Sequence, residues 1–330
     1  MQLVTLAGTG VVTTRLGFGT AGLLREPSRK ARLSILAAAF DAGIRHYDTA
    51  PTYGLGEAEE LLGTFLAQCR EPVTVTTKFG LALTPAANRL RVVQAAGRAV
   101  LKVMPSLRNF ARQRAQTLYT APTFDSVTAR STLEQSLRAL RRERADLFLM
   151  HECASAYLAN PGLYAYLHQL QQKGLIGAFG TATTYPQTLE LVKTHAELCP
   201  VVQCEQYGFG SIGVRLNSAT PRGVITHSVL SHRFVSIRQA LATNATLASR
   251  WSRELDMDTR QPEALAHLLL QAALASNPGG IVLVHSNSPK HIAANAAAAA
   301  KPLEEARLRT LQRLSASLGV AAQTPILAST

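Results

Sequence analysis

The sequence predicts an α/β fold, a (β/α)₈ TIM barrel, and three observations carry this prediction. Eight short runs rich in apolar and β-branched residues alternate with longer stretches whose apolar residues recur at helical spacing. The short runs are apolar almost without a break, as is typical of parallel strands covered on both faces. Eight such units within 330 residues match a barrel in number and size.

The other α/β fold to consider is a doubly wound open sheet. That fold would place a glycine-rich phosphate loop, G-x-G-x-x-G, directly after the first strand. The residues in that place read GTAGLLRE, which lacks the pattern. The barrel is therefore favoured.

The predicted elements follow one another in a regular order. A hairpin over residues 3–17 comes first, and we expect it to close one end of the barrel. The eight predicted strands cover residues 16–20, 44–49, 73–78, 146–151, 176–181, 201–206, 224–229 and 281–286. Amphipathic stretches between them predict helices at Ser28–Ala42, Glu57–Gln68, Ser126–Arg142 and Gln187–Leu198. Residues 293–319 predict two final helices separated at a proline.

The connection after the third predicted strand is unusually long. Between Lys78 and Asp125 lie 46 residues without a strand, so we expect an insertion over residues 81–124 that is functional or at least partly helical. The part from Arg89 to Arg114 holds seven basic residues and no acidic one. A helical lid at the mouth of the barrel is the first interpretation. A site for an anionic substrate and contact with a membrane surface are the alternatives.

Composition limits the class of protein further. With 47% apolar and 17% charged residues, the chain can bury a large core, and we expect residues 1–330 to form a single barrel domain. The formal charge of +13 could indicate nucleic acid, a membrane surface or an anionic ligand. No stacking or groove-reading motif is present, so we expect no nucleic-acid partner.

The targeting and cysteine patterns point to the cytoplasm. The N-terminus lacks the layout of a secretory signal, and no apolar run reaches the length of about 18 residues that a membrane span needs. The four cysteines are scattered, which supports neither a disulfide framework nor a zinc site. We therefore expect reduced cysteines and no metal.

Polar side chains stand at three neighbouring predicted strand ends. Asp48, Lys78 and His151 end the second, third and fourth strands, and Tyr53 lies in the loop after the second. Because reacting groups of a barrel gather at the C-terminal strand ends, we expect these four side chains to meet. Taken singly, Asp48 and Lys78 could be a buried ion pair and His151 a core histidine; their shared placement favours catalysis.

These residue types suit proton transfer to a carbonyl group. A tyrosine has a pKa of about 10, which a neighbouring ammonium lowers. A carboxylate keeps that ammonium charged despite its burial. Tyr53 would then act as general acid toward a carbonyl oxygen that His151 orients. Hydride transfer needs a nicotinamide cofactor, since no side chain can supply it.

Three stretches strongly resemble the signature blocks of the aldo-keto reductase family: DAGIRHYDTAPTYGLGEAEELLG, VTVTTKFG and ADLFLMHE. The resemblance extends over nearly the whole chain, from TTRLGFGTAGL to SPKHIAANAAAA. It implies a barrel that uses NADPH, with a catalytic tetrad of Asp48, Tyr53, Lys78 and His151.

The same resemblance implies contacts with the nicotinamide half of the cofactor. They involve Gly19 and Thr20 after the first strand, Asp48, and Gln203 for the carboxamide. The family's GVSN block reads GAFG here, so Phe179 and Gly180 replace its serine and asparagine. The family's YSPL block reads HSVL, which implies contacts from His227, in place of the stacking tyrosine, and from Ser228 and Leu230.

For the adenosine phosphate, the segment HSNSPKHIAAN resembles the family's gripping segment. It implies contacts from Ser286, Lys290, His291 and Asn295. His291 stands where the family often has an arginine for the 2′-phosphate, and Lys290 and His291 favour NADP moderately over NAD. The default role of Glu57, after the glycines at a helix start, is a helix-capping charge.

We therefore expect an NADP-dependent oxidoreductase that reduces an aldehyde or ketone to an alcohol, or catalyses the reverse reaction. Its partner would be a small carbonyl or alcohol substrate. The alternatives are an NAD-preferring sugar or alcohol dehydrogenase and a catalytically slow, cofactor-binding regulatory barrel.

Overall fold

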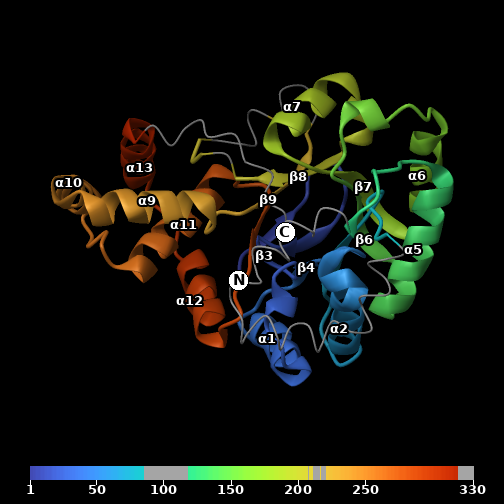
Figure 1. Cartoon of the computed structure of the whole chain (residues 1–330), viewed down its shortest axis with the longest axis horizontal. Coiled ribbons are helices and arrows are strands. Elements are labelled where there is room, and N and C mark those ends of the chain that lie inside the picture. Colours follow the sequence, from blue (N-terminus) through green and yellow to red (C-terminus); the bar gives the residue numbers. More distant parts are fainter. Residues whose placement is uncertain (85–117, 207, 211–215, 217–220, 319–330) are drawn as a thin grey trace.

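Eight parallel strands close into a barrel with helices packed around it (Figure 1). The structure is a computed structural model that describes residues 1–84, 118–206, 208–210, 216 and 221–318. Around the barrel the strands follow the order β10-β3-β4-β5-β6-β7-β8-β9. The predicted (β/α)₈ fold is confirmed.

All eight predicted barrel strands are present. Their bounds are β3 Leu16–Gly19, β4 His46–Asp48, β5 Thr74–Phe79, β6 Ala145–His151, β7 Ile176–Ala182, β8 Val201–Glu205, β9 Gly223–His227 and β10 Ile281–Val284. The predicted hairpin is also confirmed, since β1 (Leu3–Thr5) and β2 (Val12–Thr14) pair antiparallel. The hydroxyl of Thr13 lies 2.6 Å from that of Thr74, the first residue of β5, so the hairpin covers the N-terminal end of the barrel.

The α-helices follow the strands as the alternation predicts. They are α1 Arg29–Asp41, α2 Glu57–Leu66, α5 Ser126–Leu140, α6 Gly162–Gln172, α7 Tyr185–Thr194, α9 His232–Thr243, α10 Ala245–Leu255, α11 Pro262–Ser276, α12 Pro289–Ala299 and α13 Glu305–Ser317. Short 3₁₀ helices are η1 Leu23–Arg25, η2 Tyr53–Gly56, η4 Ser155–Tyr157 and η5 Ala196–Leu198. Helices α9 and α10, between β9 and β10, were not predicted; they extend to one side of the barrel (Figure 1).

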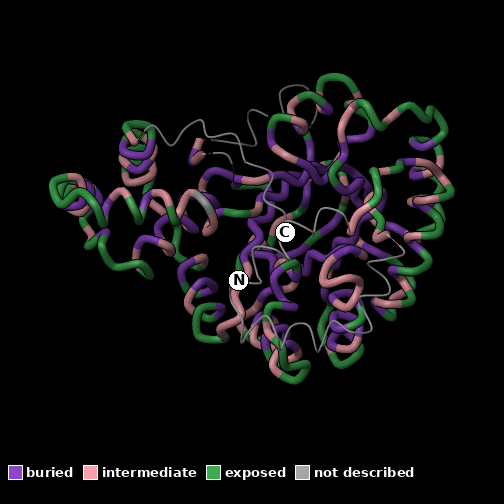
Figure 2. Tube along the Cα trace, in the orientation of Figure 1, coloured by how far each residue is buried: buried purple, intermediate pink, exposed green. Residues whose placement is uncertain are grey.

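Successive side chains of a barrel strand point alternately into and out of the barrel, and both sides are apolar. This explains why the strands are continuous apolar runs in the sequence. In β6, Leu147 and Leu149 belong to the cluster inside the barrel, together with Ile225 of β9. Phe148 and Met150, between and after them, belong to the cluster outside, with apolar residues of α5 and α6. Both faces are therefore buried, and Figure 2 shows the barrel strands as a largely buried centre.

The long connection after β5 leaves and rejoins the barrel at one point. Leu83 and Tyr119 form an antiparallel bridge. The amide of Thr84 donates to the carbonyl of Leu118 at 2.8 Å, and the amide of Thr120 to that of Ala82 at 2.9 Å. The predicted helical lid and its basic stretch, Arg89–Arg114, lie outside the described residues. Among the described helices, none combines the length and apolar character of a membrane span.

Candidate active site

The C-terminal strand ends bring the four predicted catalytic side chains together. Asp48 is the last residue of β4, Lys78 the penultimate residue of β5, and His151 the last residue of β6. These strands are neighbours in the barrel, so their ends lie side by side. Tyr53 begins η2, directly after β4.

Lys78 is the centre of the cluster. Its Nζ lies 2.8 and 2.9 Å from the two carboxylate oxygens of Asp48, 2.9 Å from the carbonyl oxygen of Thr49, and 3.1 Å from the phenol oxygen of Tyr53. Lys78 is 1% exposed and Asp48 3%. The phenol, the ammonium and the carboxylate thus form one continuous hydrogen-bonded chain in a buried site.

His151 packs against the tyrosine from the other side. The two rings are 5.7 Å apart between centroids and nearly perpendicular, at 80°. The Nδ1 atom of His151 is buried and has no hydrogen-bond partner among the described residues. A buried imidazole nitrogen without a hydrogen-bond partner is uncommon in folded proteins.

The electrostatics of the cluster hold Lys78 charged and His151 neutral. Burial lowers the pKa of Lys78, but the charges of Asp48 and Tyr53 outweigh burial and raise it above its ordinary value. Burial, with the charge of Lys78, lowers the pKa of His151 well below its usual range. The imidazole is therefore neutral at physiological pH.

The pKa of Tyr53 differs in direction from the expectation. Lys78 does lower it, but burial is the larger cause and raises the pKa of the phenol above its ordinary value. The negative charge of Asp48 also opposes Lys78. The phenol is therefore protonated at neutral pH, but the raised pKa makes it a weaker acid than the lowered pKa predicted from the sequence would.

Gln203 lies beside Asp48 inside the barrel. It lies in β8, is 3% exposed, and its Nε2 donates to a carboxylate oxygen of Asp48 at 3.0 Å. Its Oε1 has no partner in the described part of the chain. Thr20, also predicted to contact the cofactor, uses its hydroxyl to donate to the carbonyl of Asp48 at 3.0 Å. Gly19 ends β3 beside Asp48.

Phe179 and Gly180 lie away from the predicted contact. Strand β7 continues past both, to Ala182, which pairs with His151. The Phe179 ring packs on α6, 5.2 Å from His168 between ring centroids, and therefore faces out of the barrel. A side chain on Gly180 would meet the carbonyl oxygen of Val201 at 1.9 Å. Neither residue thus takes the place of the family's serine and asparagine beside the tetrad.

His227 ends β9 near the tetrad. Burial and the charge of Lys78 lower the pKa of His227 to about 4, so this ring is also neutral. Its Nδ1 lies 2.8 Å from the hydroxyl of Ser228, whose backbone is left-handed (φ 63°). Leu230 packs against the apolar cluster between the barrel and its helices.

The residues matched to the adenosine phosphate gather around the start of α12. The hydroxyl of Ser286 accepts from the amide of Ser288 at 3.1 Å. Lys290 and His291 are exposed in the first turn, and Asn295 is buried at 7%. An open pocket of about 340 Å³ adjoins this segment, lined by Ser28, Lys30, Ala31, Ser34, Ile35, Asn287 and Pro289.

Two polar residues at strand ends were not selected from the sequence. His285, directly after β10, has its Nδ1 2.9 Å from the carbonyl oxygen of Gly19, and its buried Nε2 has no described partner. Glu152 follows His151 with a left-handed backbone (φ 54°), and burial raises the pKa of its carboxyl. The strand-end rule that identified Asp48 would have found both.

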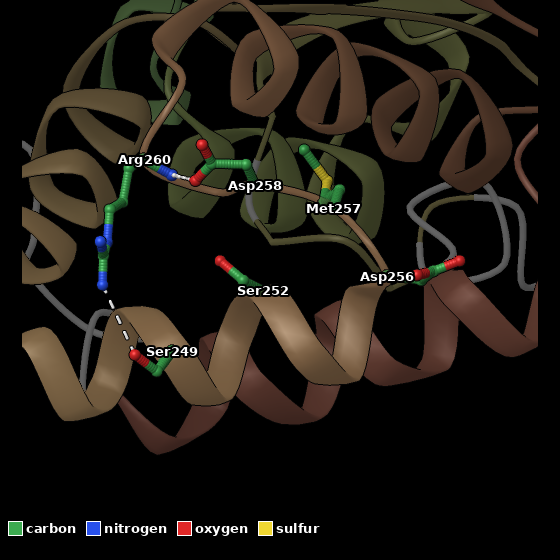
Figure 3. Close-up of a pocket in the computed structure, with 6 residues that line it drawn as sticks. All are labelled: Ser249, Ser252, Asp256, Met257, Asp258 and Arg260. Carbon is green, nitrogen blue, oxygen red and sulfur yellow. Dashed lines mark hydrogen bonds between the residues drawn. The ribbon is translucent and has the colours of Figure 1, made fainter.

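Another open pocket, of about 520 Å³, lies between α10 and the turn before α11 (Figure 3). No tetrad residue lines it. Its polar groups fix the turn: Asp258 accepts from the amide of Arg260 at 3.1 Å, and the Arg260 guanidinium reaches the hydroxyl of Ser249 at 3.5 Å. Within the described ranges, no three His, Cys, Asp or Glu side chains gather as metal ligands.

Fold and site together define a class of protein: a (β/α)₈ barrel with a buried cluster of titratable side chains at the C-terminal ends of its strands. Residues 15–316 match the model of the aldo/keto reductase family. The chain belongs to this family.

Similar proteins are named as dehydrogenases. The chain is 30% identical over 207 residues to a D-threo-aldose 1-dehydrogenase of a Pseudomonas species, covering 61% of this chain and 59% of that protein. It is 43% identical over 82 residues to the pyridoxal 4-dehydrogenase of Microbacterium luteolum, or 24% of each chain. The chain thus spans less than two thirds of the length of these curated relatives.

Solved structures share the fold at low identity. An aldo-keto reductase of Bacillus halodurans in its holo form matches with a TM-score of 0.73 and 18% identity over 99% of each chain. The glycerol dehydrogenase of Gluconobacter oxydans matches with a TM-score of 0.71 and 18% identity over 98% of each. An aldo-keto reductase of Klebsiella pneumoniae in complex with NADPH matches with a TM-score of 0.64 and 20% identity over 96% of each.

Proposed function

We propose that this protein is an NADP-dependent oxidoreductase that interconverts a carbonyl compound and an alcohol, with Tyr53 as the proton donor. One observation carries the proposal: the Nζ of Lys78 lies 3.1 Å from the phenol oxygen of Tyr53 and 2.8 Å from Asp48 in a buried site. The dehydrogenase names of its relatives and the NADPH-bound neighbour support it.

The site's unsatisfied polar atoms fit a nicotinamide cofactor. Gln203 has a free buried Oε1 that would accept from the carboxamide, while its Nε2 is held by Asp48. The neutral ring of His227 would lie against the nicotinamide. Ser286, Lys290, His291 and Asn295, with the adjoining pocket, would hold the adenosine end. Bound there, NADPH supplies the hydride.

The protein's own residues then manage the proton. Tyr53 gives its phenol proton to the substrate oxygen, and the charge of Lys78 stabilises the phenolate that remains. Asp48 keeps Lys78 charged, as the raised pKa of the lysine indicates. Neutral His151 orients the substrate oxygen through a ring nitrogen. In alcohol oxidation the Tyr53 phenolate takes the proton instead.

The test is the variant Tyr53→Phe. We expect carbonyl reduction to fall by at least about 100-fold, since general acid catalysis contributes roughly 10²–10⁴-fold. Activity should be measured on a panel of aldehydes and alcohols that includes aldose sugars and pyridoxal. Each substrate should be tested with both NADPH and NADH. A Tyr53→Phe protein as fast as wild type would refute the proposal and favour a slow, cofactor-binding regulatory barrel.

An NAD-preferring dehydrogenase is the second candidate. The 2′-phosphate would depend on Lys290 and His291, which are both exposed. Titrating both cofactors by fluorescence into wild type and Lys290→Ala decides between them. If NADP is preferred, Lys290→Ala should bind NADPH more weakly than the wild type does and should bind NADH with unchanged affinity.

The remaining proposals concern the context of the enzyme. We propose that the chain acts as one barrel domain on a small carbonyl or alcohol substrate in the cytoplasm. The four cysteines are free thiols, as a reducing compartment would keep them. Gel filtration with limited proteolysis would test the single domain.

A further inference from the structure

The loop that carries Tyr53 has a costly backbone. Between Tyr53 and Glu57 the chain makes three left-handed residues in a row, Gly54 (φ 57°), Leu55 (φ 57°) and Gly56 (φ 90°). Glycine adopts this conformation freely, but for leucine it costs on the order of 1–3 kcal/mol. Such a conformation persists only where surrounding contacts impose it.

A buried arginine on the neighbouring helix binds Glu57, the residue at which this loop ends. Arg32, on α1, is 2% exposed, although arginine is rarely buried without partners. Its Nη1 bonds the carboxylate of Glu57, its Nε donates to the carbonyl of Glu26, and its Nη2 to that of Pro27 at 3.1 Å. One guanidinium thus joins α1, the segment before it, and the end of the Tyr53 loop.

Glu57 transmits this anchor to the tyrosine. It is the residue after η2, and its amide donates to the carbonyls of Tyr53 and Gly54. The loop also rests on η1, because a side chain at Gly54 would meet Leu24 at 2.3 Å. Glu26, whose carbonyl Arg32 binds, follows η1 directly. The loop is therefore fixed both by the ion pair and by the surface that the same arginine holds.

We propose that Arg32 and Glu57 are a positioning pair for proton transfer, which holds the Tyr53 phenol at its hydrogen-bond distance from Lys78. The role in catalysis rests on the proposed function, but the positioning itself does not. A simple helix-capping role for Glu57 would require no buried arginine as its partner.

The phenol itself can report on this positioning without any cofactor. The groups that act on Tyr53 are Lys78, Asp48 and Glu152, and the His151 ring contacts it. A loosened loop reduces both burial, which raises the pKa, and the effect of Lys78, which lowers it. Because their balance is a raised pKa, loosening moves the pKa of Tyr53 down toward the 10.0 of a free tyrosine.

The experiment compares Glu57→Gln with a matched control, Glu71→Gln. Glu71 accepts from Arg45 at 2.7 and 3.1 Å just before β4, at the opposite end of the barrel. We expect Glu57→Gln to lower kcat by about 10- to 100-fold with KM little changed, since misplacing a reacting group by about 1 Å costs up to about 10²-fold. The control should keep both constants.

The second measurement is the titration of ¹³C-labelled tyrosine by NMR in the cofactor-free protein, with the Tyr53 signal identified by its loss in Tyr53→Phe. We expect the Tyr53 titration to move toward the ordinary value in Glu57→Gln and to stay in the control. Arg32→Lys, which retains the charge but loses the fork of donors, should shift both readouts in the same direction and serves if Glu57→Gln does not fold.

Two results would overturn the positioning pair. One is a folded Glu57→Gln protein with wild-type kcat and wild-type Tyr53 titration. The other is an equal loss of kcat in Glu71→Gln, which would mean a general effect of losing an ion pair. If Tyr53→Phe proves fully active, the proposed function fails, yet the NMR titration still decides whether Arg32 and Glu57 position the phenol.

Discussion

The ion pair between Asp48 and Lys78 gives a sharp prediction for Asp48→Asn. The substitution removes the negative charge and leaves the ammonium of Lys78 buried among neutral oxygens, including those of Thr49 and Tyr53 at 2.9 and 3.1 Å. At 2.8 Å the lost attraction is about 6 kcal/mol for an effective dielectric constant near 20. Desolvation of the two ions offsets most of this in the intact pair, but losing one partner costs about 3–5 kcal/mol.

The assay is urea unfolding followed by circular dichroism at neutral pH. We expect Asp48→Asn to lose about 3–5 kcal/mol of unfolding free energy, and the double variant with Lys78→Met to recover most of it. The penalty should also grow as pH falls from 10.5 toward neutral. Without the charge of Asp48, burial favours the neutral amine of Lys78 in the folded variant, so below pH 10.5 the unfolded state binds a proton that the folded variant takes up only at lower pH.

Two results would refute this reasoning. One is a loss below about 1 kcal/mol, which would mean that water or another group compensates Lys78. The other is a double variant no more stable than Asp48→Asn, because the cost would then come from packing and not from the unpaired charge.

Two further predictions concern stability. His46 is buried, and both of its ring nitrogens lie near threonine hydroxyls, at 2.9 and 3.1 Å. Burial, with the charge of Lys78, lowers the pKa of His46 from 6.5 to about 3. The unfolded state therefore binds more protons below pH 6.5, and His46 should reduce the free energy of unfolding by about 2 kcal/mol as pH falls from 6.5 to about 5. Urea unfolding of His46→Gln should no longer show this dependence on pH. Gly63 on α2 faces α5 so closely that a side chain would meet the carbonyl oxygen of Ala139 at 2.1 Å. Gly63→Ala should therefore reduce the free energy of unfolding by about 1–3 kcal/mol and lower the melting temperature. Gly279→Ala, with open space around it, should change neither. Equal effects of the two substitutions would contradict the close approach of the helices.

The fold was predictable because its signals are local. Each strand is a short apolar run, and Asp48, Lys78 and His151 stand out as charged or polar residues at the ends of such runs. Parallel strands bring such ends to one edge, so placement in the sequence becomes placement in space. Tyr53 was found from its place in the loop after the second predicted strand, and the resemblance to the family added Gln203, whose position no periodicity indicates.

The features that the sequence could not predict depend on contacts between residues that are far apart in the sequence. The direction of the Tyr53 pKa is a balance between total burial and a few charges, and burial is known only once the chain is folded. The outward face of Phe179 was hidden because β7 is apolar on both sides, which removes the usual alternation signal. The pairing of Arg32 with Glu57 joins residues 25 positions apart on different elements.

The hydrogen-bonded bridge between Leu83 and Tyr119 has a consequence for how the sequence of this protein can change. The described residues on either side of positions 85–117 are held together at this bridge, so the points where that stretch of sequence begins and ends are fixed relative to each other. Replacing residues 85–117 by a sequence of another length leaves the bridge in place. The entropy cost of closing the connection changes only slightly with its length. The sequence between the two sides of this bridge can therefore be replaced while the residues at the strand ends keep their positions.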